Sequence, residues 1–304
     1  MRVISAGLPG RTAAAIISAA IFVWPAWGDD NARPIPDFSG MWGRNSFGLE
    51  SLSGGPRPLT NLKRLANGTG DGGALVGDYN NPILKPEAAE KVRARGLVSL
   101  SGNPFPDPSN HCAPYSPPYI FSMQLGMQMV QGKKEIAFLY NQDDQVRRVH
   151  LNATHPSHVV PSAMGDSIGH YEGDTLVVDT VGVKVGPLTM ADRFGSPQSE
   201  ALHLVERYRL IDYPAAKQAQ DRYEQQEGRI GGAVGAMPLD PGPDKGLQLQ
   251  FTVEDPNVFT TPWTAQVTYH RTKLEWEEQV CAEAFHEYYS GRDAEIPKAN
   301  RPDF

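Results

Sequence analysis

Residues 167–180 read SIGHYEGDTLVVDT and carry the clearest fold signal in the chain. The run TLVVDT at Thr175–Thr180 is rich in β-branched residues, which is typical of a strand. The triplet before it, Glu172-Gly173-Asp174, has the composition of a tight turn. Upstream, residues 154–166 are interrupted by two prolines and predict a loop. The whole stretch from 154 to 180 therefore predicts a loop that leads into a β-hairpin, with its polar side chains at the mouth of a cavity.

The same alternation of apolar and polar residues recurs on both sides of this hairpin. Successive side chains of a strand point to opposite faces, so a period of two indicates strands with one buried face. Seven or more strands with short connections predict a mainly β fold, an antiparallel barrel or sandwich of calycin-like shape. The other predicted strands are Glu135–Tyr140, Val146–Leu151, Leu202–Leu210, Leu247–Val253, Trp263–Tyr269 and Leu274–Val280.

The regions around the predicted β domain, residues 119–290, differ from it in composition. Residues 29–118 form an irregular Pro- and Gly-rich wrap with one short helix over Pro86–Gly96, where proline stands in the first turn and glycine ends the helix. Residues 214–246 combine a helical pattern with a Gly- and Pro-rich linker, so we expect an insertion between two strands. Residues 291–304 are left as a C-terminal tail.

The first 28 residues have the layout of a secretory signal peptide. Arg2 and Arg11 precede an apolar run over residues 13–24, and a small-x-small site, Ala26-Trp27-Gly28, follows it. A helix needs about 20 apolar residues to cross a bilayer, and this run is shorter. We therefore expect cleavage near Gly28, a secreted or periplasmic location, and no membrane insertion after cleavage.

Charge and motifs restrict the partners. The formal net charge is −7, and removal of Arg2 and Arg11 takes it to −9. An acidic surface repels phosphate backbones, so nucleic acid is not expected as a partner. No glycine-rich nucleotide-binding loop follows a predicted strand, so NAD, FAD and ATP are not supported, and we expect no cofactor.

The chain has two cysteines, Cys112 and Cys281. In an oxidising compartment a pair of cysteines favours a disulfide over two free thiols. This bond would tie the Pro-rich wrap to the end of the β domain. Closing so long a loop contributes roughly 4–5 kcal/mol to stability when the effect is attributed to chain entropy.

The pentapeptide GDSIG at residues 165–169 matches the G-x-S-x-G pattern of a nucleophilic serine, Ser167. Such a serine acts where a strand feeds it into a tight turn that opens a helix. Here a turn and a strand follow, which favours two glycines that pack at the start of a strand. Ser167 is therefore kept as a candidate for ligand binding and not for nucleophilic catalysis.

His155 is the best single candidate for acid–base chemistry. It forms an H-x-x-H pair with His158, but a proline inside the pair disfavours a helix, so no metal site is expected. The following proline fixes the loop at His155, and Asp166, Asp174 or Asp179 could orient its ring. The alternative is a histidine that anchors the loop through backbone carbonyls.

Two further candidates lie on the strand over 202–210. Glu206 shares a face with leucines, so burial requires that it pair with an arginine of the sheet or that its pKa rise. A carboxyl with a raised pKa could transfer protons near neutral pH. His203 lies on the opposite face, beside Arg207, so His203 and Glu206 cannot enter one cavity without a bulge.

Several strings resemble a large, mostly uncharacterised group of secreted bacterial β-rich proteins: SIGHYEGDTLVVDT, SEALHLVERYR, EDPNVFTTPW and EEQVCAE. The resemblance covers about Pro36 to Glu283 and implies export and a compact β-rich fold. This chain is a divergent member, with LNA at 151–153 where the group has DGR, Asp166 in place of a histidine, and GSPQSE at 195–200 where two histidines are common.

A second, shorter resemblance concerns the barrel itself. The sequence DFSGMWG contains Gly40-x-Trp42, which resembles the motif that opens the first strand of lipocalins and other calycin barrels. In those folds an arginine from a late strand packs on the tryptophan. Arg271 is the candidate counterpart, since a guanidinium is attracted to an indole face.

Together these features predict a cofactor-independent lyase or isomerase that acts on a small, largely apolar or aromatic organic molecule by His/carboxylate chemistry. A non-catalytic, lipocalin-like binding protein is the alternative, and an envelope structural protein is a third possibility. The residues predicted to be catalytic are His155, Asp166, His203 and Glu206, and those predicted to bind the molecule are Ser167, Tyr171, Asp179 and Arg207.

Overall fold

The fold was analysed in a computed structural model of the chain. It describes residues 35–44, 48–102, 107–123, 126–227 and 244–273, together with residues 276, 278 and 281. All of these belong to one compact unit, residues 33–304. The expected signal peptide and the expected C-terminal tail lie outside the described residues.

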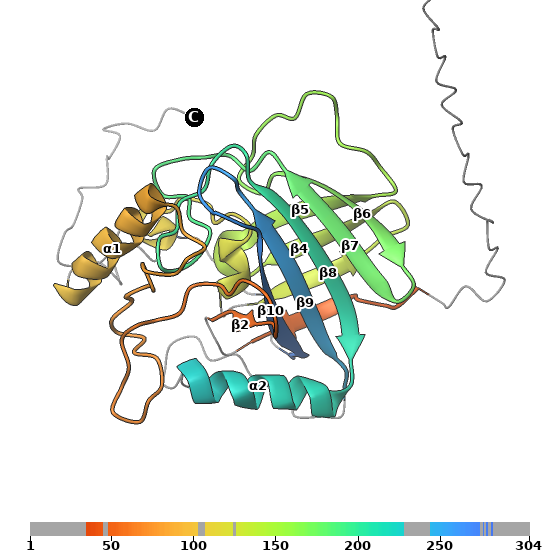
Figure 1. The fold of residues 1–304 in the computed structure, drawn as a ribbon. Helices are drawn as coiled ribbons and strands as arrows, with labels where there is room; N and C mark the ends of the chain where they lie inside the picture. The colour runs from red at the N-terminus through yellow and green to blue at the C-terminus, as the bar shows by residue number, and fades with distance from the viewer. Residues whose placement is uncertain are drawn as a thin grey trace, which may run out of the picture. The chain divides into compact units, whose positions relative to one another are not determined.

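The described chain folds into a closed β-barrel, as the alternation predicts (Figure 1). Nine strands follow one another around the barrel, and β1 closes it by pairing with both β3 and β10, while β2 adds to β10 as an extra strand. The strands are β1 (Gly40–Gly43), β2 (Glu50–Ser51), β3 (Met127–Gln131), β4 (Glu135–Tyr140), β5 (Gln145–Leu151), β6 (Asp166–Glu172), β7 (Thr175–Val181), β8 (His203–Ile211), β9 (Gly246–Glu254) and β10 (Trp263–Arg271).

One pair of strands departs from the antiparallel pattern. β5 and β6 are parallel, with Val149 opposite Ser167 and Leu151 opposite Gly169, whereas the other pairs of the barrel are antiparallel. A parallel connection requires the chain to cross back to the end of the barrel where β5 began. Residues 152–165 make this crossover, and alternation alone could not have revealed it because it does not encode strand direction.

The described residues contain two α-helices and three short 3₁₀ turns. Helix α1 runs beyond its predicted end, because Gly96 packs closely on Val76 and does not terminate it. Helix α2 begins within one residue of the start of the predicted insertion, 214–246, and forms its helical part as far as Glu227. The bounds are α1 (Pro86–Leu100), α2 (Tyr213–Glu227), η1 (Pro108–His111), η2 (Tyr119–Ser122) and η3 (Gln142–Asp144).

The last predicted strand, over 274–280, is not formed at the residues that can be checked. β10 ends at Arg271, and Trp276 and Glu278 lie in no strand, while the other residues of that segment lie outside the described residues. The short apolar pattern of Leu274, Trp276 and Val280 misled the prediction, because three apolar residues on one face do not guarantee a paired neighbour.

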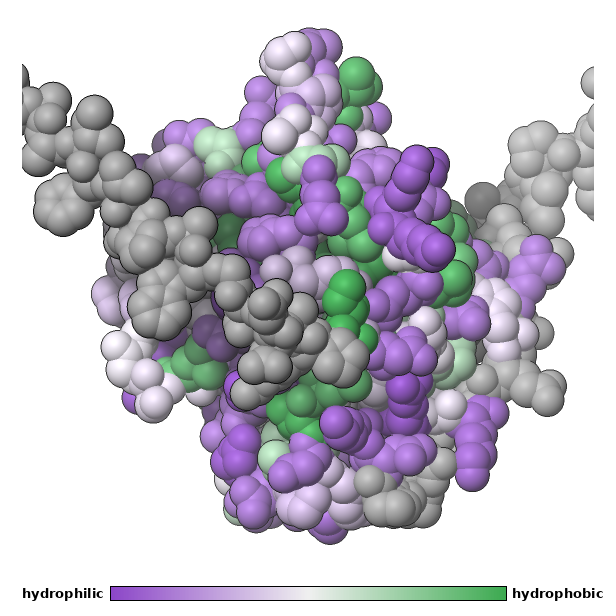
Figure 2. Space-filling view, turned by 90° about the vertical axis from the view of Figure 1, so that its right-hand side faces the viewer, coloured by the Kyte–Doolittle hydropathy of each residue, from purple (hydrophilic) through white to green (hydrophobic). Residues whose placement is uncertain are grey.

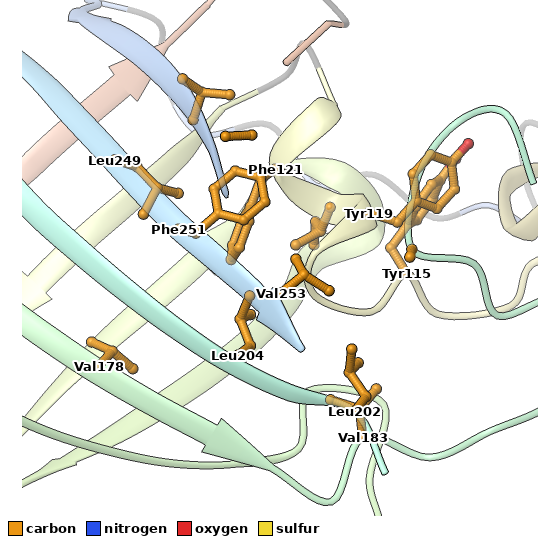
Figure 3. Close-up of a cluster of buried hydrophobic side chains, with 14 of the residues drawn as sticks. Tyr115, Tyr119, Phe121, Val178, Val183, Leu202, Leu204, Leu249, Phe251 and Val253 are labelled. Atoms are coloured by element: carbon orange, nitrogen blue, oxygen red, sulfur yellow. The ribbon is translucent and has the colours of Figure 1, made fainter. Parts of the chain in front are cut away.

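The core lies inside the barrel, where the inward side chains of β7, β8 and β9 meet η2 (Figure 3). The rings of Phe121 and Phe251 pack edge to face with centroids 5.1 Å apart. At the barrel closure the guanidinium of Arg271 lies 3.8 Å from the ring centroid of Trp42, which is fully buried. The expected cation–π contact is therefore present.

The two cysteines are bonded to each other, as predicted. The Cα atoms of Cys112 and Cys281 are 5.4 Å apart. A disulfide suits a protein that folds in an oxidising compartment. Within the described part of the chain, no helix has the length and apolar character needed to cross a membrane.

Candidate functional site

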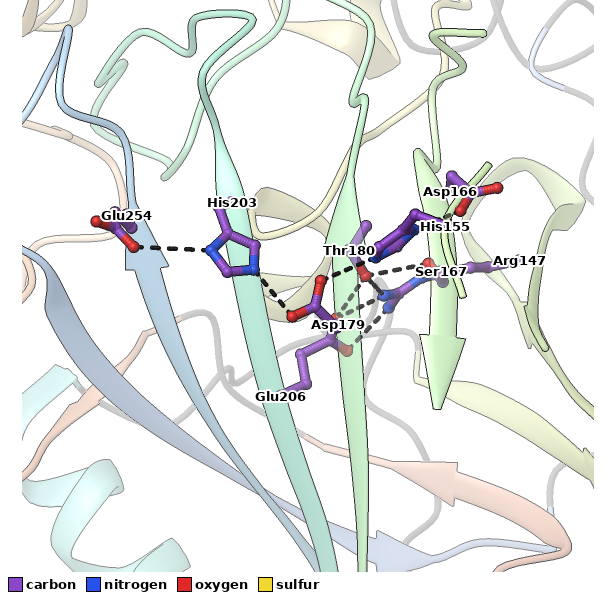
Figure 4. A network of polar contacts seen from close by, with 9 residues as sticks. All are labelled: Arg147, His155, Asp166, Ser167, Asp179, Thr180, His203, Glu206 and Glu254. Atoms are coloured by element: carbon purple, nitrogen blue, oxygen red, sulfur yellow. Dashed lines mark hydrogen bonds and ion pairs between the residues drawn. The ribbon is translucent and has the colours of Figure 1, made fainter. Parts of the chain in front are cut away.

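Polar side chains occupy both faces of the barrel wall at one level of β6, β7 and β8 (Figure 4). The register sets this arrangement: Ser167 pairs with Thr180, and Thr180 pairs with Leu204, so these three side chains share the interior face. Their strand neighbours Asp166, Asp179 and His203 therefore point outward.

Five of the outward residues form a continuous row, which we call the outer row. The Nδ1 atom of His155 lies 2.5 Å from Oδ1 of Asp166, and its Nε2 atom lies 2.9 Å from Oδ1 of Asp179. The other Asp179 oxygen lies 2.9 Å from Nε2 of His203. The row ends where Nδ1 of His203 faces Oε2 of Glu254 at 3.6 Å. Carboxylates and imidazoles thus alternate across four strands and one loop.

The ends of four strands position the outer row. Asp166 is the first residue of β6 and His203 the first of β8, while Glu254 is the last of β9 and Asp179 lies near the end of β7. His203 and Glu254 are direct partners in the ladder. His155 comes from the crossover between β5 and β6, so the parallel connection is what returns this residue to the barrel wall.

His155 has both ring nitrogens committed to carboxylates. Burial lowers the pKa of His155, but hydrogen bonds to Asp166 and Asp179 outweigh that effect and the pKa is raised overall. Burial raises the pKa of Asp179, and hydrogen bonds from His203 and His155 more than offset this, so that pKa is lowered. Both shifts favour the imidazolium form of His155 and the carboxylate form of Asp179.

His203 differs from His155 in one respect. Asp179 holds its Nε2 atom, but Nδ1 is separated from Glu254 by more than a hydrogen-bond distance. The side chain is 37% exposed. In the neutral ring, an Nε2–H that donates to Asp179 leaves Nδ1 with a free lone pair. This is the geometry of a histidine oriented by a carboxylate for proton transfer.

The interior face carries a second set of polar residues, which we call the inner cluster. Arg147 donates to both carboxylate oxygens of Glu206, at 2.9 and 2.5 Å. It also donates through Nε to Ser167 at 3.0 Å and through Nη2 to Thr180 at 2.6 Å. The hydroxyl of Tyr208 donates to Glu206 at 2.6 Å. The cluster is a bidentate ion pair with nearly complete hydrogen bonding.

The inner cluster is buried and fills the barrel at this level. Its five side chains are at most 2% exposed, and the guanidinium lies between the rings of Phe121 and Phe138, with centroids 6.0 and 5.8 Å away. Burial lowers the pKa of Arg147, but Glu206 outweighs burial and keeps that pKa above its usual value. The sequence predicted that Glu206 either pairs with an arginine of the sheet or has a raised pKa. The structure shows the pairing with an arginine of the sheet.

The remaining predicted site residues lie apart from the outer row. Tyr171 accepts a hydrogen bond from Gln131 at 2.8 Å, and Arg207 forms an ion pair with Glu172. Ser167 is inside the barrel, with Gly165 and Gly169 packed against β7 and β5. His158 is exposed on the crossover loop. In the described part of the chain, no three His, Cys, Asp or Glu side chains converge in a way that could hold a metal ion.

Four members of these clusters were not identified from the sequence: Glu254 of the outer row, and Arg147, Thr180 and Tyr208 of the inner cluster. Glu254 ends a strand whose outward face is polar throughout, so nothing distinguishes it until the ladder sets it opposite His203. Arg147 lies in the run VRRVHL beside Arg148, and one of the two must point inward. A search of the predicted strands for a positively charged side chain able to neutralise Glu206 would have left Arg147 and Arg148 as the candidates.

No protein-family model, curated protein or solved structure matches this chain.

Proposed function

We propose that this protein is a cofactor-independent acid–base enzyme, a lyase or isomerase, whose site is the outer row. The observation that carries the proposal is His203: Asp179 orients its ring, its side chain is 37% exposed, and its Nδ1 atom lies 3.6 Å from Glu254, beyond hydrogen-bond distance. A general base needs a positioned lone pair within reach of a substrate proton. Among the predicted site residues, His203 meets that requirement best.

The proposed step is a proton transfer at carbon. Nδ1 of His203 takes a proton from a C–H bond next to a carbonyl group, and the electron pair of that bond moves onto the carbonyl oxygen as an enolate. In an isomerase the imidazolium returns the proton to a neighbouring atom. In a lyase the enolate collapses, a bond to the β-carbon breaks, and the leaving group receives the proton. Asp179 stabilises the imidazolium that forms between the two steps.

In this proposal His155 is a positioning residue. Both its nitrogens hold carboxylates, so neither faces a substrate, and its positive charge fixes Asp179 in place for His203. Asp166 in turn fixes His155. The catalytic role that the sequence suggests for His155 therefore passes to His203, and Glu206 contributes to the stability of the barrel and not to the reaction.

Exposed apolar side chains on the loop that carries His155 and on the segment after β7 are consistent with a partly apolar substrate. The crossover loop exposes Val160, and the segment after β7 exposes Val185; the two segments are joined by a bridge between Ser162 and Val183. Seen from the side on which β6 and β7 lie in Figure 1, the surface carries hydrophobic side chains in small groups among hydrophilic ones (Figure 2). Small apolar contacts and a few polar groups are what an organic ligand needs.

The binding-protein alternative needs a cavity within the barrel. The inner cluster and the aromatic rings of Phe121, Phe138 and Phe251 occupy the described interior. A site on the outer wall avoids this conflict, which is why we place the proposed chemistry there.

Proton exchange can test the proposal before the substrate is known. The protein is incubated in D₂O with a panel of small aromatic ketones and β-hydroxy ketones, and loss of the C–H signal is followed by NMR. We expect exchange with at least one compound, and a loss of about 10²-fold or more in His203→Gln, the usual contribution of a general base. The His155→Asn variant should shift the pH profile of exchange as well as lower its rate.

His170→Gln is the matched control, because His170 lies on the same outward face of β6, is 54% exposed and contacts Glu172 instead of the outer row. Its exchange rate should equal that of the unaltered protein. Exchange that persists in His203→Gln, or no exchange with any compound of the panel, contradicts the proposal.

A further inference from the structure

A buried histidine lies under helix α2, away from the outer row. His270 stands near the end of β10 and is 6% exposed, and its Nε2 atom has no hydrogen-bond partner among the described residues. Two residues earlier, on the same face of β10, the buried Oγ1 atom of Thr268 also lacks one. Leaving a buried polar atom unpaired costs about 1–3 kcal/mol. Covering this part of β10 with α2 therefore costs free energy.

Helix α2 is held by three buried side chains and by a few polar contacts. The Gln226 carbonyl accepts hydrogen bonds from the backbone N–H of Gly70 and from Arg64, and Arg222 pairs with Glu50. Ala216 lies against Gly246 of β9, where a Cβ atom would come within 2.5 Å of it. Ala219 and Tyr223 are the other buried side chains of the helix, and the Tyr223 ring lies 5.5 Å from the Arg44 guanidinium. Two alanines bury little apolar area, so packing favours the closed position only modestly.

The charges that face His270 come from α2. They are Lys217, Asp221 and Glu224, and Lys217 is itself bonded to Asp221 at 2.7 Å. From β1 the residue paired with His270 is Gly43, which brings no charge. Burial lowers the pKa of His270; the two carboxylates oppose this and Lys217 adds to it, so the pKa is lowered overall.

We propose that α2 is an acid-released cover: protonation of His270 expels the helix from the barrel wall and exposes the polar face of β10. A charged imidazole beneath a helix loses its hydration, and among the described residues no hydrogen-bond partner of Nε2 replaces that water while α2 is closed. The cover is independent of the outer row, so this proposal and the proposed function can fail separately.

The stability of the closed position of α2 depends on pH because the pKa of His270 differs between the closed and open states. The closed state favours neutral His270, so the stability of the closed state is fully present above the pKa of the open-state imidazole, about 6.5. It is lost as the pH falls from there through the lowered pKa of the closed state. A single proton increases the opening equilibrium by at most about tenfold for each pH unit in that range.

Hydrogen–deuterium exchange of the full chain, read by mass spectrometry between pH 5 and pH 8, tests the cover. After correction for intrinsic exchange rates, we expect peptides from α2 to gain several-fold in opening as the pH falls, while peptides from β7 stay constant. His270→Gln should remove the pH dependence, and exposed His150→Gln should retain it. Glu224→Gln removes a carboxylate that favours the charged ring in the closed state, so it should increase the total gain in opening and extend the pH-dependent range to lower pH.

Opening of α2 that does not change with pH in the unaltered protein overturns the proposal. So does a pH dependence that persists in His270→Gln. If His270→Gln fails to fold, Glu224→Gln decides the matter. An acid-induced gain in opening no larger than that of the unaltered protein overturns the proposal.

Discussion

Adjacent arginines of β5 have opposite environments. Arg147 points into the barrel and pairs with Glu206 where both side chains are at most 1% exposed, whereas Arg148 points outward to Glu135 with exposed fractions of 61% and 41%. Charges in water gain little from pairing, whereas a buried charge that loses its partner has no solvent to replace it. Residue type alone therefore says little about the energetic role of either arginine.

Because their environments differ, an Arg→Gln substitution should lower the free energy of unfolding by different amounts at Arg147 and at Arg148. Arg147→Gln leaves the Glu206 carboxylate buried without its counter-charge and should lower the free energy of unfolding by about 3–5 kcal/mol. Arg148→Gln removes only an exposed pair and should cost less than about 1 kcal/mol. Urea unfolding at neutral pH measures both. Equal costs for the two variants would show that the inner cluster does not stabilise the barrel as described.

His155 should titrate above the usual range for histidine. Because Asp166 and Asp179 favour its charged form, the raised pKa adds stability that is complete below about pH 6.5 and is lost as the pH rises through the folded-state pKa. NMR titration of the His155 ring should show this, and Asp166→Asn should lower that pKa. Asp174→Asn should leave it unchanged, since the Asp174 carboxylate bonds Thr175 instead.

At the scale of elements, the glycines of the GDSIG pentapeptide have a packing role. Gly165 precedes β6 with a φ of +69°, and a Cβ atom there would lie 2.7 Å from the carbonyl oxygen of Val181. Gly169 lies on Val149 in the parallel pair with β5. The motif thus holds the start of β6 against its neighbours, and the serine between the glycines points inward to Arg147.

Gly165→Ala should therefore destabilise the fold by about 1–3 kcal/mol, through a strained backbone and a clash with β7. Gly55→Ala is the control, because a Cβ atom there meets nothing within 4 Å. It should be neutral or slightly stabilising, by less than about 1 kcal/mol. Thermal unfolding measures the stability of both variants. A Gly165→Ala variant as stable as the unaltered protein would contradict the packing role of Gly165.

Sequence patterns located most strands but not their arrangement. Local alternation was enough for β4, β5, β7, β8, β9 and β10, because one buried face imposes a period of two on each strand by itself. β1 was signalled only by Gly40-x-Trp42, and the parallel pair could not be foreseen because direction depends on partners distant in sequence.

For the candidate site as well, the sequence indicated which face of a strand a residue occupies but not which distant residues it contacts. Alternation correctly set His203 and Glu206 on opposite faces of β8. It could not show that the crossover loop returns His155 to Asp166 and Asp179, since that contact depends on the parallel connection. The proximity of Glu254 to His203 depends in turn on the register of β8 against β9. Many outward residues of these strands are polar, so the sequence does not determine that register.

At the scale of the whole molecule, one covalent bond joins parts that are distant along the chain. Cys112 and Cys281 are 169 residues apart in sequence. Constraining so long a loop in the unfolded chain should stabilise the protein by roughly 5 kcal/mol when the effect is attributed to chain entropy. Reduction, or Cys112→Ser with Cys281→Ser, should lower the unfolding temperature accordingly. An unchanged unfolding temperature after complete reduction would contradict this contribution.

The closure of the barrel also has a consequence for how the protein reaches its native state. β1 pairs with β10 through Trp42 and Arg271, which are 229 positions apart (271 minus 42). Contacts between such distant segments form late and slowly, because the loop entropy is lost before the contact stabilises anything. Until β10 is available, β1 and β9 present unpaired edges that can join other chains. During synthesis the barrel therefore cannot close until residue 271 has emerged, and the open edge of β1 persists for that entire interval.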